Sequence, residues 1–566
     1  MLQESAAPHR RAADLMVDSL VAHGVDRVFC VPGESYLAVL DALADCRSIE
    51  VVSARHEGGA GFMAVADAKL TGRPGVLMVS RGPGATNAAI AIHTAQQDAA
   101  PLVVFIGQVE RKDFGRRAFQ EVDYAKTFAD MAKGVRQVID GDRLGETVAW
   151  AFHCAMSGTP GPVVVVVPED MLLDPVTAGT ASPRQPAQPE ASPADLAEVG
   201  RRIAAAERPL VIVGGVLTRP DARSAILALA ERWQVPIATS FKQQDLFPNL
   251  HPNFAGHLGY MIPEDQVAAL SEADLVIAVG TRLGDVTSQG YRLPQAPTPR
   301  QPLIHVYPDP EQLGRVYETT LALAVDPVQF VRGLSEISPP PPPNARSHWI
   351  ERLHRIHAER ARWTAVEARD GVSFGHVVAA LAAHLPPEAI LITDAGNFSG
   401  WLHRHFPFAG SQRLLGVISG AMGFGAPAAV AASLRHPDVK VVALIGDGGF
   451  LMTGNELATA RRHGVKPVLF ISNNGSYGTI RMHQERHFPG RAMATDLVNP
   501  DFAALARAFG ATGLTIASTK EAGDVVREAL IAEGPVVVDV RASLEHISAF
   551  ATLTDLAKRA AGARAS

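Results

Sequence analysis

The sequence predicts an α/β fold built from three doubly wound parallel-sheet domains, and three observations lead to it. Short apolar segments rich in valine, isoleucine and leucine alternate with helical stretches along the chain, which is the pattern of a parallel sheet covered by helices on both faces. Proline-rich breaks at residues 175–195 and 339–343 divide the 566 residues into three blocks of similar size. The alternation repeats in each block, so we expect domains at 1–178, 195–338 and 346–566.

The strands are expected where the apolar runs are continuous, because strands buried on both faces of a sheet carry no polar side. In the first block these runs predict strands at 27–31, 51–54, 76–80, 102–106 and 163–167, with helices at 37–44, 58–70 and 85–96. In the second block they predict strands at 210–213, 236–239, 275–279 and 304–306, and in the third at 390–393, 441–445, 468–471 and 536–540. Ligands of such folds bind at the carboxyl ends of the strands, so residues that directly follow a strand are the candidates for a site.

The composition argues against several classes of function. The chain is 47 % hydrophobic and 19 % charged, as in a large globular protein. Its net charge of −6 and its pI near 6.4 provide no basic surface for nucleic acid or an anionic membrane, so neither partner is expected. No apolar stretch approaches the ~18 residues of a membrane span. Three cysteines without a disulfide pattern, and a start that lacks the basic and apolar segments of a signal peptide, predict a cytoplasmic protein.

A split motif in the third block predicts a metal-bridged diphosphate. Gly446-Asp447-Gly448-Gly449 follows one expected strand, and Asn474 follows the next, 27 positions after Asp447. A carboxylate and an amide at neighbouring strand ends can bind one Mg²⁺ through oxygen atoms, and phosphate supplies further ligands. Glycines beside the aspartate let backbone N–H groups approach the phosphates. The alternative is two turns that only connect strands, since Asp-Gly and Asn-Gly are common turn pairs.

Three further strand ends carry residues with chemical potential. Glu57 opens a helix and is either its N-terminal cap or a catalytic acid–base group. The turn GPGATN at 82–87 leads from a strand into a helix. Gly396 and Asn397 follow the strand 390–393 and can present N–H groups to a phosphate.

Eight short motifs, taken in chain order, resemble those of the thiamine diphosphate-dependent enzymes, and among them the catalytic large subunit of acetolactate synthase. They are VPGE (31–34), HEGGA (56–60), GPGATN (82–87), GQVE (107–110), AFQE (118–121), SGAMGFGAP (419–427), GDGG (446–449) and NNGSYG (473–478). They cover the first and third blocks. The resemblance implies a pyrimidine-binding domain, a central Rossmann-like domain and a diphosphate-binding domain.

The resemblance also implies which residues bind the cofactor. Mg²⁺ would be held by Asp447, Asn474 and the backbone carbonyl of Ser476, and Met422 would be the wedge that bends thiamine diphosphate. The cofactor-binding set carried over from the family is Gly33, Glu57, Gly396, Asn397, Gly420, Met422, Gly446, Asp447, Gly448, Gly449, Asn474, Ser476, Tyr477 and Gly478.

The catalytic residues implied by the resemblance are Glu57, Glu34, Phe119 and Gln120. Glu57 would share a proton with the pyrimidine ring and so activate the cofactor. Phe119 and Gln120 would border the reacting carbon of the 2-oxo acid. The substrate pocket would be lined by Tyr477, Thr479, Ile480 and His483.

By the same resemblance the chain decarboxylates a pyruvate-like 2-oxo acid and joins the two-carbon unit to a second carbonyl compound. The active site would lie between two subunits, with Glu57 of one chain facing Asp447 of the other, so a homo-oligomer of two or four chains is expected. Acetolactate synthases bind FAD in the central block, and 213–216 and 280–282 resemble parts of that site, whereas the loop 284–290 is shortened. FAD occupancy stays open, with an empty Rossmann-like domain as the favoured interpretation.

One departure from the family pattern keeps a second function open. Glu34 stands where acetolactate synthases carry a small residue, and 2-oxo acid decarboxylases place an acid at about this position as a proton relay. Glu34 is therefore either such a relay or a cap of the helix 37–44. As a relay it would favour a non-oxidative 2-oxo acid decarboxylase or C–C lyase that releases an aldehyde, although the histidine pair of those decarboxylases is missing from 110–121. A separate, minor departure is Arg81, which replaces the usual small or polar residue before GPGATN.

Two other classes of protein fit less well. A catalytically silent subunit would be expected to lack Glu57 or Asp447, and both are present. A Rossmann dehydrogenase requires G-x-G-x-x-G followed by an acid that binds the ribose, and that combination is missing from the sequence.

Overall fold

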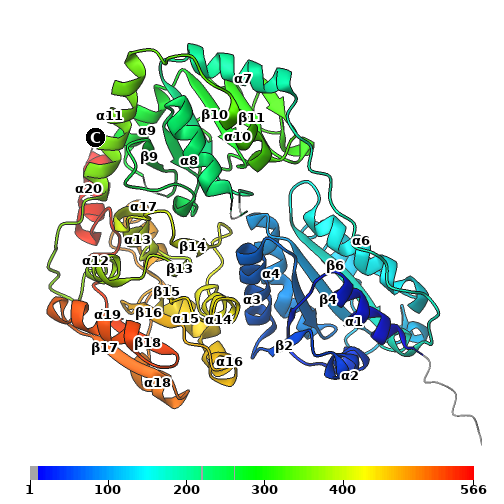
Figure 1. Ribbon diagram of the computed structural model, residues 1–566. Coiled ribbons are helices and arrows are strands. Elements are labelled where there is room, and N and C mark those ends of the chain that lie inside the picture. Colours follow the sequence, from blue (N-terminus) through cyan, green and yellow to red (C-terminus); the bar gives the residue numbers. More distant parts are fainter. Residues whose placement is uncertain (1–9, 218, 220, 261, 566) are drawn as a thin grey trace, which may run out of the picture. The chain divides into compact units, whose positions relative to one another are not determined.

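The computed structural model of the chain describes residues 10–217, 219, 221–260 and 262–565 (Figure 1). Its named strands form three six-stranded sheets, and their pairings are all parallel. Helices alternate with the strands. The predicted fold class is therefore confirmed. The chain divides into two compact units, residues up to Ala187 (the first unit) and residues from Gln188 (the second unit).

The first unit contains one sheet, in the strand order β2-β1-β3-β4-β6-β5. Its strands are β1 (Arg27–Cys30), β2 (Glu50–Ser53), β3 (Gly75–Val79), β4 (Leu102–Gln108), β5 (Gly134–Gln137) and β6 (Pro162–Pro168). Its helices are α1 (Ala12–Ala22), α2 (Leu37–Asp45), α3 (Glu57–Thr71), α4 (Pro83–Asp98), α5 (Tyr124–Thr127) and α6 (Leu144–Met156). Figure 1 shows α3 and α4 on one face of this sheet and α1 and α6 on the other, which explains why its central strands are apolar on both sides.

The second unit begins with a central sheet in the order β12-β11-β10-β7-β8-β9. Its strands are β7 (Pro209–Val213), β8 (Ile237–Thr239), β9 (Phe254–His257), β10 (Leu275–Val279), β11 (Leu303–Val306) and β12 (Leu321–Leu323). The apolar sides of α7 (Pro193–Ala205), α8 (Ala222–Trp233) and α10 (Pro327–Glu336) join one core with these strands. Helices α9 (Glu264–Ser271) and α11 (Ala345–Ala361) contribute to a second core on the same sheet.

The last sheet, also in the second unit, has the order β14-β13-β15-β16-β18-β17. Its strands are β13 (Ile390–Thr393), β14 (Arg413–Gly416), β15 (Val441–Gly446), β16 (Val468–Asn473), β17 (Thr512–Ile516) and β18 (Val536–Arg541). Its helices are α12 (Gly375–His384), α13 (Ser399–His405), α14 (Gly425–Arg435), α15 (Asp447–Thr453), α16 (Leu457–Arg462), α17 (Gly478–His487), α18 (Phe502–Ala508), α19 (Ala522–Ile531) and α20 (Leu553–Ala565). Helices α12, α13 and α19 share one core with the strands.

The register of the strands decides where the sequence motifs meet. In the first unit β1 lies between β2 and β3, so the loops that follow these three strands are neighbours. In the last sheet β15 lies between β13 and β16, which brings the ends of those three strands together. Both groups of motifs therefore lie at the carboxyl edges of their sheets, where ligands of open α/β folds bind.

The two sheets of the second unit are joined by buried polar contacts. Arg223 of α8 forms an ion pair with Asp245 and donates to the carbonyls of Gly410 (3.1 Å) and Gln412 (2.9 Å). Asp245 in turn accepts a hydrogen bond from the backbone N–H of Leu414 in β14, at 3.0 Å. These contacts fix the segment that follows β8 against the last sheet.

Several smaller expectations concern individual segments. Residues 176–192 and 338–343, within the expected breaks, contain neither helix nor strand. The three cysteines are free, and Cys30 is the one that is fully buried. Within the described ranges, none of the helices is long and apolar enough to cross a membrane. The first nine residues, on which the signal-peptide argument rests, lie outside the described residues.

Candidate active site

Glu57 is the first residue of α3 and lies four positions after Ser53, the last residue of β2. The helix is capped by the preceding residue, His56, whose Nδ1 accepts a hydrogen bond from the N–H of Gly58 at 3.0 Å. The cap interpretation of Glu57 is therefore wrong. Its half-buried carboxylate instead accepts a hydrogen bond from the side-chain amide of Asn87, at 2.9 Å. Because Asn87 belongs to the GPGATN turn, the beginnings of α3 and α4 are tied to each other.

The turn that follows β3 is in contact with two of the predicted catalytic residues. A Cβ atom at Gly84 would lie 3.3 Å from Oε1 of Glu57, and a Cβ atom at Gly82 would lie 2.9 Å from the Cβ of Gln120. Gly82 has a φ of +55°, and its N–H donates to the Tyr124 hydroxyl at 2.8 Å. Glu57 and Gln120 thus flank one glycine-rich turn at the edge of the sheet.

Glu34 forms an ion pair at the same edge. It begins a short 3₁₀ turn, η1 (Glu34–Tyr36), and the N-cap of α2 is Tyr36, so the interpretation of Glu34 as the cap of that helix is wrong. Its Oε1 lies 3.1 Å from Nη2 of Arg81, and Nη1 of the same arginine lies 2.7 Å from Oε2 of Glu169. The Arg81 side chain is 9 % exposed, whereas that of Glu34 is 63 % exposed.

Two further residues predicted in the first unit have clear positions. At Gly33 a Cβ atom would lie 2.5 Å from the Cβ of Ser80, so the loops after β1 and β3 are packed backbone against side chain. Phe119 is 75 % exposed. Its ring therefore contributes little to the core of this unit and is accessible to a ligand or a second polypeptide.

Asp447 is the first residue of α15, at the end of β15, and is 3 % exposed. Its Oδ1 accepts a hydrogen bond from the N–H of Gly448 (2.8 Å), and its Oδ2 accepts from the N–H of Gly475 (2.9 Å) and the amide of Asn499 (2.8 Å). Burial raises the pKa of the Asp447 carboxyl group. These partners are N–H groups, which orient the carboxylate without supplying a full positive charge.

Asn499 is a functional candidate that the sequence interpretation missed. Its amide donates to Asp447 and also to Oδ1 of Asn473, at 2.9 Å, while the amide of Asn473 donates to Asp539, also at 2.9 Å. Of the asparagine pair, Asn474 therefore remains to line the cavity, and its Oδ1 accepts a bond from the N–H of Ser476 at 3.1 Å. Asn499 follows no expected strand and belongs to none of the eight motifs, so its role was not visible in the sequence.

A cavity of about 450 Å³ lies at the carboxyl ends of β13, β15 and β16. All twelve cofactor-binding residues expected in the second unit line it: Gly396, Asn397, Gly420, Met422, Gly446, Asp447, Gly448, Gly449, Asn474, Ser476, Tyr477 and Gly478. The expected pocket residues Thr479, Ile480 and His483 line it as well. The fold thus brings residues from four separate sequence segments to one hollow.

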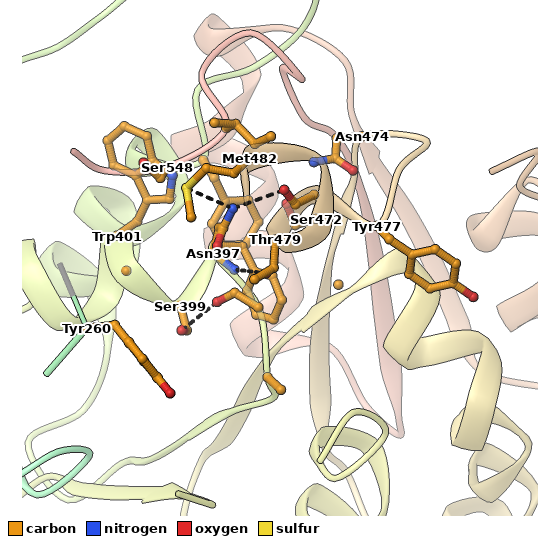
Figure 2. A pocket seen from close by; sticks show the side chains of 18 of the residues that line it. Tyr260, Asn397, Ser399, Trp401, Ser472, Asn474, Tyr477, Thr479, Met482 and Ser548 are labelled. Atoms are coloured by element: carbon orange, nitrogen blue, oxygen red, sulfur yellow. Dashed lines mark hydrogen bonds between the residues drawn. The ribbon is translucent and has the colours of Figure 1, made fainter. Parts of the chain in front are cut away.

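One wall of the cavity is organised around Asn397 (Figure 2). Its backbone N–H donates to Oγ1 of Thr479 at 3.1 Å, and its side-chain amide donates to the carbonyl of Gly478 at 3.2 Å. The same amide lies 3.5 Å from the sulfur of Met482. Figure 2 shows Tyr260 on the other side of the cavity from Asn474. In this arrangement the donors of Asn397 tie the end of β13 to the start of α17.

The central sheet also contributes to the cavity, which the sequence interpretation did not predict. Phe241, Lys242, His257 and Tyr260 line it. Lys242 is 3 % exposed, and its Nζ lies 3.5 Å from the backbone oxygen of Asp394. Burial raises the pKa of the Asp394 carboxyl group to about 6 and lowers that of His257 to about 4. Lys242 follows β8 by a few residues, so its position at a strand end was the signal that could have identified it.

The residues present fit a Mg²⁺-bound diphosphate. A neighbouring cation stabilises the ionised form of a buried carboxylate, because an uncompensated buried charge is costly in free energy. At Gly448 a Cβ atom would lie 2.5 Å from the Tyr477 ring, so glycine keeps the backbone between them open. Among the described residues no group of three or more His, Cys, Asp or Glu side chains could hold a metal. One carboxylate, one amide and one carbonyl oxygen, completed by phosphate and water, is instead a donor set suited to Mg²⁺.

Comparison with known families agrees with this geometry. The family model described as "Thiamine pyrophosphate enzyme, N-terminal TPP binding domain" matches residues 10–127. The models for the central domain and for the C-terminal TPP binding domain match residues 196–334 and 394–540. The three matched segments include Glu57, Asp447 and Asn474.

Individual relatives cover nearly the whole chain. The acetolactate synthase large subunit of Parasynechococcus marenigrum (strain WH8102) is 34 % identical, over 93 % of this chain and 87 % of that protein. The acetolactate synthase isozyme 1 large subunit of Escherichia coli (strain K12) is 31 % identical, over 94 % of each chain. A solved structure, the Rhodococcus jostii RHA1 thiamine diphosphate-dependent 4-hydroxybenzoylformate decarboxylase, superimposes with a TM-score of 0.82 at 24 % identity, covering 94 % of this chain and 99 % of that one. At that identity, the structure supports the fold alone.

Proposed function

Because the chain belongs to the thiamine pyrophosphate enzyme family, we propose that it decarboxylates a pyruvate-like 2-oxo acid and joins the two-carbon unit to a second carbonyl compound. The observation that carries this proposal is the convergence of all the expected cofactor-binding residues of the second unit on one cavity, with buried Asp447 among them. The acetolactate synthase relatives support ligation as the second step.

In this proposal Asp447, Asn474 and the carbonyl of Ser476 hold Mg²⁺, and Gly396 and Gly448 lie beside the diphosphate. The Ser476 carbonyl accepts one hydrogen bond, from the N–H of Gly478 at 2.8 Å, and a carbonyl oxygen has a second lone pair for a metal. When bound, thiamine diphosphate would supply a nucleophilic carbon and a sink for the electron pair that decarboxylation releases. The chain's own residues hold, orient and protonate the reactants around it.

Glu57 is the proposed acid–base residue of the first unit. Its carboxylate is held by the Asn87 amide, and we assign to it the proton shared with the pyrimidine ring. Phe119 and Gln120, near the same turn, would face the reacting 2-oxo acid. The three-domain division at 1–178, 195–338 and 346–566 follows the same assignment.

A homo-oligomer whose active sites are shared between two copies is part of the proposal. It is supported by large apolar side chains that are exposed in both units of the chain: Phe119 (75 %), Phe488 (61 %), Met493 (77 %) and Val498 (103 %). Apolar side chains of this size are stabilised when a second protein surface covers them and removes them from water. Glu57 of one copy would then complete the cavity of its partner. A cytoplasmic location and the lack of nucleic-acid or membrane partners remain predictions from the sequence.

We further propose that the central sheet acts without FAD. The glycine pair at the end of β7 has an internal reason: a Cβ atom at Gly214 would lie 1.7 Å from Oγ of Ser240, and one at Gly215 would lie 2.4 Å from the carbonyl oxygen of Gly280. These glycines are required by close packing of neighbouring loops, so they carry no argument for a dinucleotide. The absorption spectrum of the purified protein between 350 and 500 nm tests this: about one flavin per chain would contradict it.

A non-oxidative decarboxylase that releases an aldehyde is the second candidate. It is favoured by one observation: the carboxylate of Glu34 is exposed at the same sheet edge as Glu57 and Gln120, on the neighbouring loop. A carboxyl group there can deliver a proton to a reacting carbon.

The two functions are separated by incubation with thiamine diphosphate, Mg²⁺ and pyruvate, with the products resolved by NMR. The expected product is acetolactate or acetoin. Glu57→Gln should lower the rate at which it forms by a factor of about 10² or more. Acetaldehyde alone would favour the second candidate. Cofactor binding without turnover of pyruvate would contradict the proposed substrate class and leave the cofactor site supported.

A further inference from the structure

Two charged residues of the first unit, Glu34 after β1 and Arg81 after β3, are in direct contact. By the resemblance to the family both stand where smaller residues are usual, and the structure pairs them at 3.1 Å. From this contact we infer that Arg81 is a positioning residue for Glu34: it fixes the Glu34 carboxylate at the reaction edge, where that carboxylate governs whether the product is an aldehyde. The inference rests on the proposed thiamine diphosphate chemistry.

Arg81 is built to hold a fixed position. It follows β3, its side chain is 9 % exposed, and its backbone N–H donates to Oγ of Ser35 at 3.1 Å. The hydroxyl of Ser35 also lies 3.1 Å from that of Ser80. These contacts join the loop that carries Glu34 to the loop that carries Arg81, so the two charged side chains start from backbones locked together.

Glu169 is the anchor on the opposite side. It follows β6, its backbone N–H donates to the carbonyl of Gln108 at 3.0 Å, and its carboxylate lies 2.7 Å from Nη1 of Arg81. The guanidinium is thus shared by two carboxylates from different loops. A planar, rigid guanidinium can hold two acceptors at fixed directions, which a lysine ammonium on a flexible stem cannot. Glu169 therefore orients Arg81, and Arg81 orients Glu34.

The pair is next to the predicted catalytic residues. The residue after Arg81 is Gly82, where a Cβ atom would lie 2.9 Å from the Cβ of Gln120. A Cβ atom at Gly84 would lie 3.3 Å from Oε1 of Glu57. A shift of Arg81 therefore moves the loops at the edge of the sheet where the reacting carbon is expected. Its guanidinium donates to Oε1 of Glu34 at 3.1 Å, while the Glu34 side chain as a whole stays 63 % exposed.

Release of an aldehyde defines what Glu34 would do. The bond between the keto carbon and the carboxylate of the 2-oxo acid breaks, CO₂ leaves, and the electron pair left on carbon forms a C–H bond with a proton. That proton comes from water and passes through the Glu34 carboxyl group. In ligation the same electron pair attacks a second carbonyl carbon instead, so the ratio of aldehyde to ligated product reports on Glu34.

The test compares Glu34→Gln, Arg81→Met, Arg81→Lys and the double variant Glu34→Gln/Arg81→Met, loaded with thiamine diphosphate and Mg²⁺ and supplied with pyruvate. We expect Glu34→Gln and Arg81→Met each to lower the rate of aldehyde release about tenfold or more, with KM changed less than about threefold. The double variant should release aldehyde no more slowly than the slower single variant, because both substitutions act on the Glu34 carboxylate. Arg81→Lys should restore part of the loss.

Arg111→Met is the matched control. Arg111 also joins two carboxylates of the first unit, Asp170 and Asp174, both at 2.8 Å. Its hydrogen bonds and ion pairs with described residues go to Asp170, Asp174 and the Ile139 carbonyl, and so involve neither Glu34 nor Glu57. Its product ratio should equal that of the wild type. The inference would be overturned if Arg81→Met gave the same ratio of aldehyde to ligated product as the wild type. It would also be overturned if the losses of the two single variants multiplied in the double variant. A third contrary result is a wild type that makes ligated product alone, with the same products from Glu34→Gln.

A structural measurement separates failure of this inference from failure of the proposed function. Crystal structures of the wild-type apoprotein and of Arg81→Lys are compared, and Arg81→Lys serves even if Arg81→Met does not fold. The Glu34 carboxylate should be ordered in the wild type and displaced in Arg81→Lys. A Glu34 side chain in the same place in both would overturn the positioning role even if no 2-oxo acid were turned over. Absence of turnover by wild type would contradict the proposed function alone.

Discussion

Asp447 illustrates how single residues are prepared for a metal. Its carboxylate is buried, burial raises its pKa, and its named partners supply N–H groups from three directions. With two of these bonds on Oδ2 and one on Oδ1, Oδ1 keeps a lone pair that can bind a metal. Groups that orient a ligand without touching the metal usually change affinity by about 10–100-fold when they are removed.

Asn499→Ala is therefore expected to weaken Mg²⁺ binding by about 10–100-fold at saturating thiamine diphosphate, because Asp447 loses one of its orienting donors. Titration of the apoprotein with Mg²⁺, followed by calorimetry or cofactor fluorescence, measures this. Asn455→Ala, at an exposed asparagine of the same unit, is the control. Equal Mg²⁺ affinities in both variants and wild type would show that Asn499 plays no part in the site.

His257 predicts a dependence of stability on pH. Burial lowers its pKa to about 4 in the folded chain, against an ordinary value of 6.5. Between these values the unfolded chain binds more protons, so this group makes folding less stable as the pH falls from 6.5 toward 4. Half-buried His357, whose pKa desolvation lowers to about 3, acts in the same direction. Asp394, whose pKa is raised to about 6, acts in the opposite direction, because its folded form holds a proton that the unfolded form loses.

The His257 contribution is isolated by comparing His257→Asn with wild type at pH 7.5 and pH 5. At pH 5 the cost of keeping His257 neutral is about 2 kcal/mol, and the variant should lose that much less stability on acidification. Chemical unfolding at the two pH values measures the difference, with His348→Asn, an exposed histidine of the second unit, as control. Parallel losses in all three proteins would contradict the assignment.

Among the elements, α3 owes its position to small residues. A Cβ atom at Gly61 would lie 2.3 Å from the Cβ of Ala91 in α4, closer than two such atoms can approach. The glycine therefore lets α3 and α4 pack closely. Since α3 begins with Glu57 and α4 contains Asn87, which is bonded to it, the packing of the two helices also sets the position of the proposed acid–base residue.

Gly61→Ala should destabilise the protein by about 1–3 kcal/mol, because an extra methyl group is forced into a close contact. It should also lower activity, because α3 and α4 must separate. Gly61→Ala/Ala91→Gly, which exchanges the two residues, should recover most of both losses. Thermal unfolding and steady-state kinetics on the single and the exchanged variant are the measurements. An exchanged variant as unstable as the single one would show that the Gly61–Ala91 contact is not the cause.

Which strands could be predicted follows from where they lie in the sheets. The strands expected from continuous apolar runs all form. The five that were missed, β5, β9, β12, β14 and β17, are all at sheet edges. An edge strand is partly exposed and carries a weaker apolar run, as in Gly134–Gln137 and Thr512–Ile516, where few residues are buried. A continuous apolar run indicates a strand that is buried on both faces of its sheet, so this pattern identifies central strands best.

For the molecule as a whole, the metal-bound diphosphate could be predicted from oxygen ligands and glycines at strand ends, and the other cofactor motifs from their resemblance to a known family. Contributions that depend on long-range packing were not. Lys242 and His257 reach the cavity because the central sheet is anchored to the last sheet through Arg223 and Asp245. The pair of Glu34 and Arg81 depends on the neighbouring registers of β1 and β3. No spacing along one strand reveals such contacts.

The central claim is that Glu57 and Asp447 act in one site, contributed by two copies of the chain. Mixing inactive Glu57→Gln with inactive Asp447→Asn, after dissociation and reassembly at equal concentrations, tests it most directly. If the site is shared, half of the dimers are mixed and each has one intact site, so about a quarter of the wild-type activity should return. If both residues act within one chain, every site carries one of the two substitutions. Activity no higher than that of the separate variants would then contradict the account.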